Sequence, residues 1–191
     1  MSQLVENIPS TAISGVEGNL ALDSILQKWV IGVIGDKIEG QFVRPRWQYV
    51  EAGYPDIGVT WCSFATRESN PDCSATVLYK NKQAVSFRHE ELQVVFSFFG
   101  QNGWELACDL RDGLELWQNR LILLQNNMDV IVVERMDRIP ELVNQQWQNR
   151  VDCTIRLRRN SVRQFTMGTI TSVKVNINGE VNKNGSWIKC E

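Results

Sequence analysis

The chain has 191 residues, of which 43% are hydrophobic, and a formal charge of −2. This length and composition suit one domain with its own core, and the charge excludes strong bulk binding to DNA, which relies on a surplus of Lys and Arg. The five cysteines are odd in number and widely spaced, and the single histidine offers no paired metal ligand. We therefore expect reduced thiols in a cytosolic setting, no zinc site and no disulfide framework. We also expect neither a signal peptide nor a membrane segment.

The N-terminal part of the chain changes character near residue 20. Residues 1–19 are rich in Ser, Gly and Asn, and we expect a flexible arm there, or one that orders against a partner. Over residues 20–34 apolar side chains recur at steps of three and four, which predicts an amphipathic helix that ends near Gly35.

An extended segment with basic and aromatic side chains follows at residues 40–50. Pro45 within it indicates an edge strand or an irregular extended segment, because proline cannot donate to a sheet ladder. Arg44, Arg46 and Trp47 form a cluster that could bind phosphate or a protein partner, or simply be a solvated edge.

The next segments have the pattern of strands. Residues 59–65 are expected as a strand, residues 67–74 as a loop, and residues 75–80 with 84–89 as a hairpin. The second strand of that hairpin continues into residues 90–99, where apolar and polar side chains alternate and predict one buried face.

A long amphipathic helix is predicted over residues 102–125. Asn102 is a suitable N-cap, and Glu105 would complete a capping box. Gly113 in the helix interior indicates a close backbone approach, because glycine there costs up to about 1 kcal/mol relative to alanine. We expect Trp104 and Trp117 to pack in the core.

The last third of the chain is predicted to be mostly β. Residues 129–134 read as a short strand, residues 136–147 as a loop or helical turn, and residues 149–159 as a half-buried strand whose other face is polar and basic. Asn178-Gly179 predicts a hairpin between residues 169–177 and 180–188. We treat that hairpin as a β extension outside the core.

Arginines are concentrated in and after the half-buried strand. Three interpretations are open: contact with nucleic-acid phosphates, pairing with acidic residues of a neighbouring subunit, or a solvated face that discourages edge pairing. The near-neutral charge of the whole chain favours the second. The residues are Arg150, Arg156, Arg158, Arg159 and Arg163.

No pattern in the sequence predicts catalysis. His89 stands beside Glu90 and Glu91 and could act as a general base, but no nucleophile motif accompanies it. Neither nucleotide-binding glycine motif is present. We therefore predict a protein that is not an enzyme and has no metal and no cofactor, with its function in its surfaces.

Five segments, taken in order, resemble the neck terminator (tail-terminator-like) proteins of contractile-tailed bacteriophages. The resemblance covers about residues 40–165 and leaves the first helix and the C-terminal β extension outside it. None of the segments is a short catalytic signature, so the ordered set carries the resemblance. They are RPRWQ at 44–48, DIGVTWCSF at 56–64, RHEELQVVFSFFG at 88–100, LRDGLELWQNR at 110–120 and ELVNQQWQNRVDCTIRLRR at 141–159.

The resemblance implies an α+β fold, with a mixed, largely antiparallel sheet flanked by amphipathic helices, to which the sequence pattern adds a C-terminal β-hairpin extension. The domains would be a flexible arm at 1–19, a terminator-like domain at 20–165 and the extension at 166–191. It further implies a homo-oligomeric ring, with six copies expected, in the virion neck, assembled in the bacterial host cytoplasm.

In that role the ring would cap the head-proximal end of the tail tube and stop further tube subunits from adding. Its partners would be tail tube and sheath proteins and the head connector, with no membrane. Phage DNA would pass through the bore without specific binding. Strand edges and tryptophan segments are natural material for the interfaces of such a ring. Candidate interface residues are Arg44, Arg46, Trp47, Trp147, Arg150, Arg156, Arg158, Arg159 and Arg163.

A nucleic-acid-binding module is the alternative function. It would use Arg44, Arg46, Trp47 and the arginine-rich face, and it predicts salt-dependent DNA binding that weakens when Arg156 and Arg158 are replaced.

Overall fold

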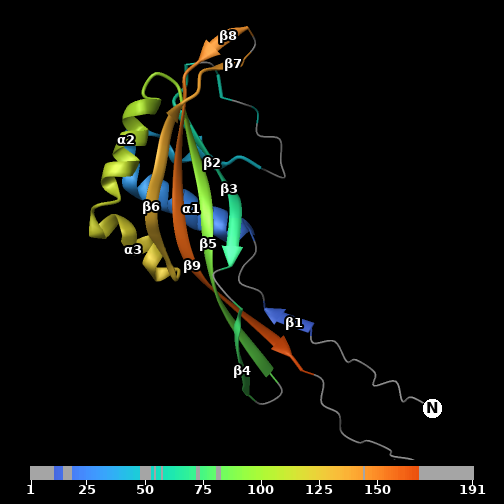
Figure 1. Cartoon of the computed structure of the whole chain (residues 1–191). Coiled ribbons are helices and arrows are strands. Elements are labelled where there is room, and N and C mark those ends of the chain that lie inside the picture. Colours follow the sequence, from blue (N-terminus) through green and yellow to red (C-terminus); the bar gives the residue numbers. More distant parts are fainter. Residues whose placement is uncertain are drawn as a thin grey trace, which may run out of the picture.

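Two long antiparallel strands form the spine of the molecule (Figure 1). The structure, a computed structural model, describes residues 11–14, 19–47, 53, 55–56, 58–71, 74–80, 83–143 and 145–167. Within it β5 (Gln83–Phe99) and β9 (Arg150–Thr166), each of 17 residues, pair along their whole length. At about 3.3 Å per residue such a ladder is roughly 55 Å long.

Five further strands complete the main sheet, whose order is β1-β9-β5-β3-β2, with β4 also paired to β5 and β6 to β9. Among the strands of this sheet that the structure describes, β2 and β3 are the one parallel pair. The prediction of an α+β fold with a mixed, largely antiparallel sheet is therefore confirmed. The added strands are β1 (Thr11–Ser14), β2 (Val43–Pro45), β3 (Trp61–Pro71), β4 (Thr76–Lys80) and β6 (Met128–Arg138).

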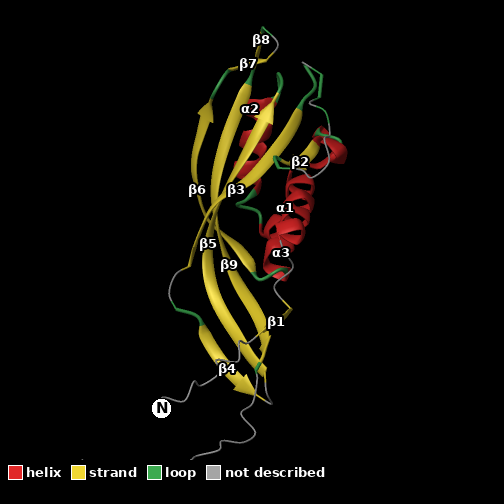
Figure 2. Cartoon of the chain, turned by 90° about the vertical axis from the view of Figure 1, so that its right-hand side faces the viewer, coloured by secondary structure: helices red, strands yellow, loops and turns green. Residues whose placement is uncertain are grey.

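Three helices cover one face of one half of the sheet (Figure 2). They are α1 (Asn19–Ile34), α2 (Gly103–Gly113) and α3 (Trp117–Gln125), and two short 3₁₀ turns, Gly35–Lys37 and Gly40–Phe42, follow α1. We call the covered side the helix face and the other side the open face.

The core lies between the helices and the alternating apolar side chains of the strands. Trp29 of α1 is fully buried, and its ring meets the edge of Phe96 with ring centroids 5.7 Å apart. The even-numbered apolar residues of β5 and the odd-numbered ones of β9 face this core, as their alternation predicted. They are Leu92, Val94, Phe96, Phe98, Val151, Cys153, Ile155 and Leu157.

The single helix predicted at 102–125 is wrong, because the structure has two helices separated by a turn at residues 114–116. A Cβ on Gly113 would lie 2.6 Å from Cγ1 of Val33, which confirms the close approach predicted there. Asn119 Nδ2 donates a hydrogen bond of 2.8 Å to the Gly113 carbonyl, so the end of α2 is satisfied by the start of α3.

Two details of the predicted helix also differ. The Asn102 side chain makes no capping hydrogen bond, so the expected capping box is absent. Trp117 is 63% exposed, because the turn at 114–116 rotates α3 away from the stripe of a continuous helix. Trp104 is partly buried against the core, close to the expectation.

Strands extend further than the sequence pattern indicated. β3 reaches Pro71 through the predicted loop, since a proline at the end of a strand costs little. Residues 136–147 form the end of β6 and most of a small hairpin, where a loop or helical turn was expected. The hairpin pairs β7 (Glu141–Val143) with β8 (Gln146–Gln148).

The two chain ends differ in how far the structure describes them. Thr11–Ser14, inside the segment expected to be a flexible arm, form β1 and pair with β9. The hairpin predicted over residues 169–188 lies outside the described residues.

Beyond the helices the sheet continues as a narrow extension (Figures 1 and 2). We call it the arm and define it as β1, β4, residues 83–89 of β5 and residues 160–166 of β9. Glu90 and Arg159 form an ion pair of 2.7 Å on the helix face at the point where the covered half of the sheet ends.

Candidate interaction surfaces

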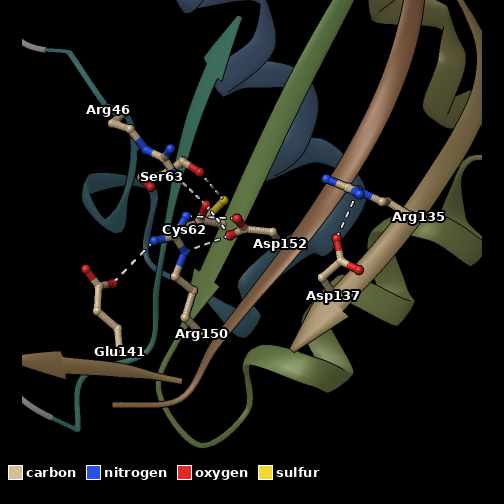
Figure 3. A network of polar contacts seen from close by, with 9 residues as sticks. Arg46, Cys62, Ser63, Arg135, Asp137, Glu141, Arg150 and Asp152 are labelled. Atoms are coloured by element: carbon tan, nitrogen blue, oxygen red, sulfur yellow. Dashed lines mark hydrogen bonds and ion pairs between the residues drawn. The ribbon is translucent and has the colours of Figure 1, made fainter. Parts of the chain in front are cut away.

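A buried polar cluster lies on the open face, at the end of the sheet opposite the arm (Figure 3). Asp152 is 5% exposed. Its carboxylate accepts hydrogen bonds from Arg150 Nε and Nη2, both at 2.8 Å, and from Ser97 Oγ at 2.6 Å. Arg46 in turn donates to Ser97. The cluster thus joins β5 and β9 to the segment that directly follows β2.

The protonation of the cluster follows from these contacts. Burial raises the pKa of Asp152, but the hydrogen bonds from Arg150 and Ser97 outweigh it, and the net pKa is lowered. The pKa of Arg150 is raised, chiefly by its hydrogen bond to Asp152. Glu141 adds a longer contact to Arg150 at 3.5 Å. Asp152 is therefore an ionised structural group.

Two of the other strand arginines also find partners in their own chain. Arg156 lies 2.5 Å from Glu134 and 3.4 Å from Glu91, and Arg159 pairs with the largely buried Glu90. The pKa of Glu134 is lowered, first by a hydrogen bond from Gln93 and then by Arg156. Three of the predicted interface arginines, including Arg150, are thus engaged inside the subunit.

The five arginines do not form one surface. Because side chains alternate along a strand and the β5–β9 register runs without a shift, Arg156 and Arg158 lie on the open face, whereas Arg159 and Arg163 lie on the helix face. Arg163 is exposed on the arm. The single arginine-rich face read from the sequence is therefore wrong.

The side chains of the cluster predicted at residues 44–47 also lie in different environments. Arg44 lies over the Trp61 ring at 5.0 Å and donates to the Gly53 carbonyl at 3.0 Å, while Arg46 belongs to the Asp152 cluster. Trp47 alone is strongly exposed, at 79%.

Trp147 lies in the hairpin of β7 and β8, at the end of the molecule opposite the arm (Figure 1). It is 72% exposed and stands across the hairpin from the exposed Leu142. A paired Trp and Leu in water suit a contact with another protein.

Sequence reasoning missed two further apolar surfaces. One is on the arm, where Leu78 and Tyr79 of β4 are exposed by 58% and 70%. The other, which we call the shoulder, is made by Leu116, Trp117 and Leu121 at the start of α3, exposed by 57%, 63% and 38%. The sequence did contain an indication of the shoulder. The apolar side chains of residues 102–125 span a wider arc than one buried face of a single helix would occupy.

The candidate metal ligands and reactive groups of the chain are its carboxylates, its thiols and its single histidine. No group of three His, Cys, Asp or Glu residues there could hold a metal ion. Burial raises the pKa of Cys62, and it raises that of Cys153 to about 12, so neither thiol is a ready nucleophile. His89 is exposed on the arm. None of the described helices is long and apolar enough to cross a membrane.

Comparison with known families identifies the class of protein to which the chain belongs. A family model described as phage neck terminator protein matches residues 20–185. The chain belongs to this family. The match includes α1 and extends past residue 165. The family region is therefore longer than the stretch of about residues 40–165 covered by the sequence resemblance, and it takes in the first helix and most of the C-terminal segment. A comparison with curated proteins found no match.

The neck terminator family is one of structural phage proteins, and it places this chain in the neck and tail region of the virion. A terminating role needs surfaces for other proteins. The exposed tryptophans, the shoulder and the arm are the exposed apolar surfaces described above.

Proposed function

We propose that this neck terminator forms a homo-oligomeric ring of six copies at the head-proximal end of the tail tube. There it stops the addition of tube subunits, contacts tube and sheath proteins, and joins the tail to the head connector while DNA passes through. The family match over residues 20–185 carries this proposal. We further propose that the chain is assembled in the host cytoplasm and has no enzymatic activity.

The two edges of the sheet are candidate surfaces for contacts between copies in the ring. Among the described residues, β6 is paired only with β9, so its outer edge is free, and β2 covers only the Cys62–Phe64 stretch of β3. The two edges lie on opposite sides of the sheet. Different surfaces on opposite sides are what a head-to-tail contact needs, and repeated head-to-tail contacts close into a ring.

The charge distribution supports passage of DNA without tight binding. Arg150, Arg156 and Arg159 are neutralised by carboxylates of the same chain, and the net charge is −2. A nucleic-acid-binding module that used the arginine-rich strand would need these cations to be free. This alternative would be supported by salt-dependent DNA binding that is lost on replacing Arg156 and Arg158.

Tube polymerisation tests the function directly. Purified tail tube protein of the same phage is polymerised with and without the neck terminator, and tube lengths and ends are measured by electron microscopy. We expect shorter tubes, each with a ring of six copies at one end, and the same ring in virion necks. Unchanged tube lengths together with necks that lack the protein would refute the proposal.

A further inference from the structure

Within the described part of the chain, no helix lies beside the arm (Figures 1 and 2). The strands β5 and β9 continue past the Glu90–Arg159 pair and carry β1 and β4 there, whereas α3 packs on α1 and β6. A small sheet normally buries at least one face against another layer. Every residue of β4 is exposed. The described residues therefore provide no second layer to cover the arm.

The side of the arm continuous with the helix face combines apolar and basic groups. Cross-strand register places Tyr79 beside Ala84 and Phe165, and Val77 beside Ser86 and Arg163. Arg88 lies on the same side, because it is one of the even-numbered residues of β5.

The charges on the arm are all of one sign. Its described residues include Lys80, Arg88 and Arg163 and no Asp or Glu. Among the described residues Arg88 and Arg163 have no ion-pair partner. Since the whole chain has a charge of −2, the excess of acid lies elsewhere on the molecule.

The shoulder is complementary in both respects. Trp117 and Leu121, one helical turn apart, expose apolar surface beside Leu116. Glu115 adjoins them, is exposed, and has no ion-pair partner in the described part of the chain. The nearby Arg120 is already neutralised by Asp129, with Nε 2.9 Å from the carboxylate. The shoulder is thus an apolar patch with an unpaired carboxylate.

We propose that the arm of one copy packs its helix-face side on the shoulder of the next copy, with Tyr79 against the Trp117 patch and Arg88 and Arg163 near Glu115. The occupant is a second copy of this chain because the two surfaces match in apolar content and in charge. Arm and shoulder are different surfaces, so the contact is head-to-tail and repeats around a ring. The inference rests on the proposed ring for its closure and adds which surfaces make it.

Mixing two variants gives a decisive test. Tyr79→Asp damages the arm, and Trp117→Asp damages the shoulder; both sites are exposed, so thermal unfolding should be unchanged. Each variant alone should fail to form rings. An equal mixture should give a heterodimer and no ring, because one intact arm and one intact shoulder remain. Masses are measured by light scattering and native mass spectrometry, alone and on tail tubes.

Matched controls and a second readout protect the test. Leu78→Asp is on the same strand but the opposite side of the arm and should leave rings intact, as should Gln118→Asp on α3. A photo-crosslinking amino acid at position 79 should join residues 112–121 of another copy. Glu115→Arg should raise the dissociation constant of the contact between copies at least tenfold. Adding Arg88→Glu and Arg163→Glu to the Glu115→Arg chain should restore ring formation.

The outcomes separate the two proposals. Wild-type rings that are indifferent to Tyr79→Asp and Trp117→Asp, or crosslinks that map elsewhere, would overturn the arm–shoulder contact and leave the proposed function standing. Equal damage from Leu78→Asp and Tyr79→Asp would overturn the assignment of the side. Absence of wild-type rings both in solution and on tail tubes would overturn the ring and the contact together.

Discussion

Replacing Asp152 with alanine tests whether the open-face cluster holds the sheet together. The Asp152 side chain is 7% exposed and accepts two hydrogen bonds from Arg150 and one from Ser97. Its removal leaves the Arg150 guanidinium, 18% exposed, with the 3.5 Å contact to Glu141 and the Phe99 ring 5.8 Å away. Breaking a buried ion pair on one side costs about 3–5 kcal/mol. Because Glu141 partly compensates, we expect a loss of about 2–3 kcal/mol in the free energy of unfolding.

Urea unfolding at neutral pH measures this loss. With a slope of about 1–3 kcal/mol/M for a domain of this size, the midpoint should fall by roughly 1 M. The double variant Arg150→Met with Asp152→Leu is the control. It removes both charges and replaces them with apolar volume, so it should recover most of the stability.

Two results would contradict the reasoning. A loss below about 0.5 kcal/mol for Asp152→Ala would be that of an ordinary surface substitution. A double variant less stable than Asp152→Ala would show that packing or strain, not the unpaired Arg150 charge, sets the cost.

Three further predictions follow from particular contacts. Because the pKa of Asp152 is lowered in the fold, its stabilisation is complete above its unfolded pKa of about 3.9 and is lost as pH falls through the lower folded value; the urea midpoints of wild type and Asp152→Asn should differ most above about pH 4, approach each other as pH falls further, and meet only below the folded pKa. Gly113→Ala should lower stability by about 1–3 kcal/mol in thermal unfolding, because its Cβ would meet Val33 at 2.6 Å, whereas Gly40→Ala, with 3.4 Å to the nearest side-chain atom, should be milder. Trp147→Ala should leave folding and rings unchanged but weaken binding to purified tails or to the head connector more than about tenfold; unchanged binding to both would remove the β7–β8 hairpin from the list of contact surfaces.

The spine was predictable because its signal is local. Alternation in residues 90–99 and 149–159 identified the central strands and their buried faces, since a period of two has one geometric meaning. The break in the helix after Gly113 could not be predicted from the sequence, because Leu114, Glu115 and Leu116 all favour helix. The turn is set by the closeness of Gly113 to Val33 and by the Asn119 hydrogen bond, both of which are tertiary contacts.

The candidate interface shows the same limit. The density of arginines in β9 was visible, but their partners Glu90, Glu91 and Glu134 are fixed by strand register and not by sequence proximity. The separation of Arg156 from Arg159 onto opposite faces could have been predicted from strand alternation alone. The exposure of Trp117 could not, because it depends on the turn before α3.

The arm is built from the same two strands that form the centre of the core, and this affects the speed and cost of assembly. An arm that folds only on contact must lose its conformational entropy at the moment of binding. Here the continuous β5–β9 ladder has already ordered the arm when the core folds. In the proposed arm–shoulder contact a neighbouring subunit would therefore meet a preorganised surface, and the rate at which subunits join should be limited by collision and orientation rather than by a folding step.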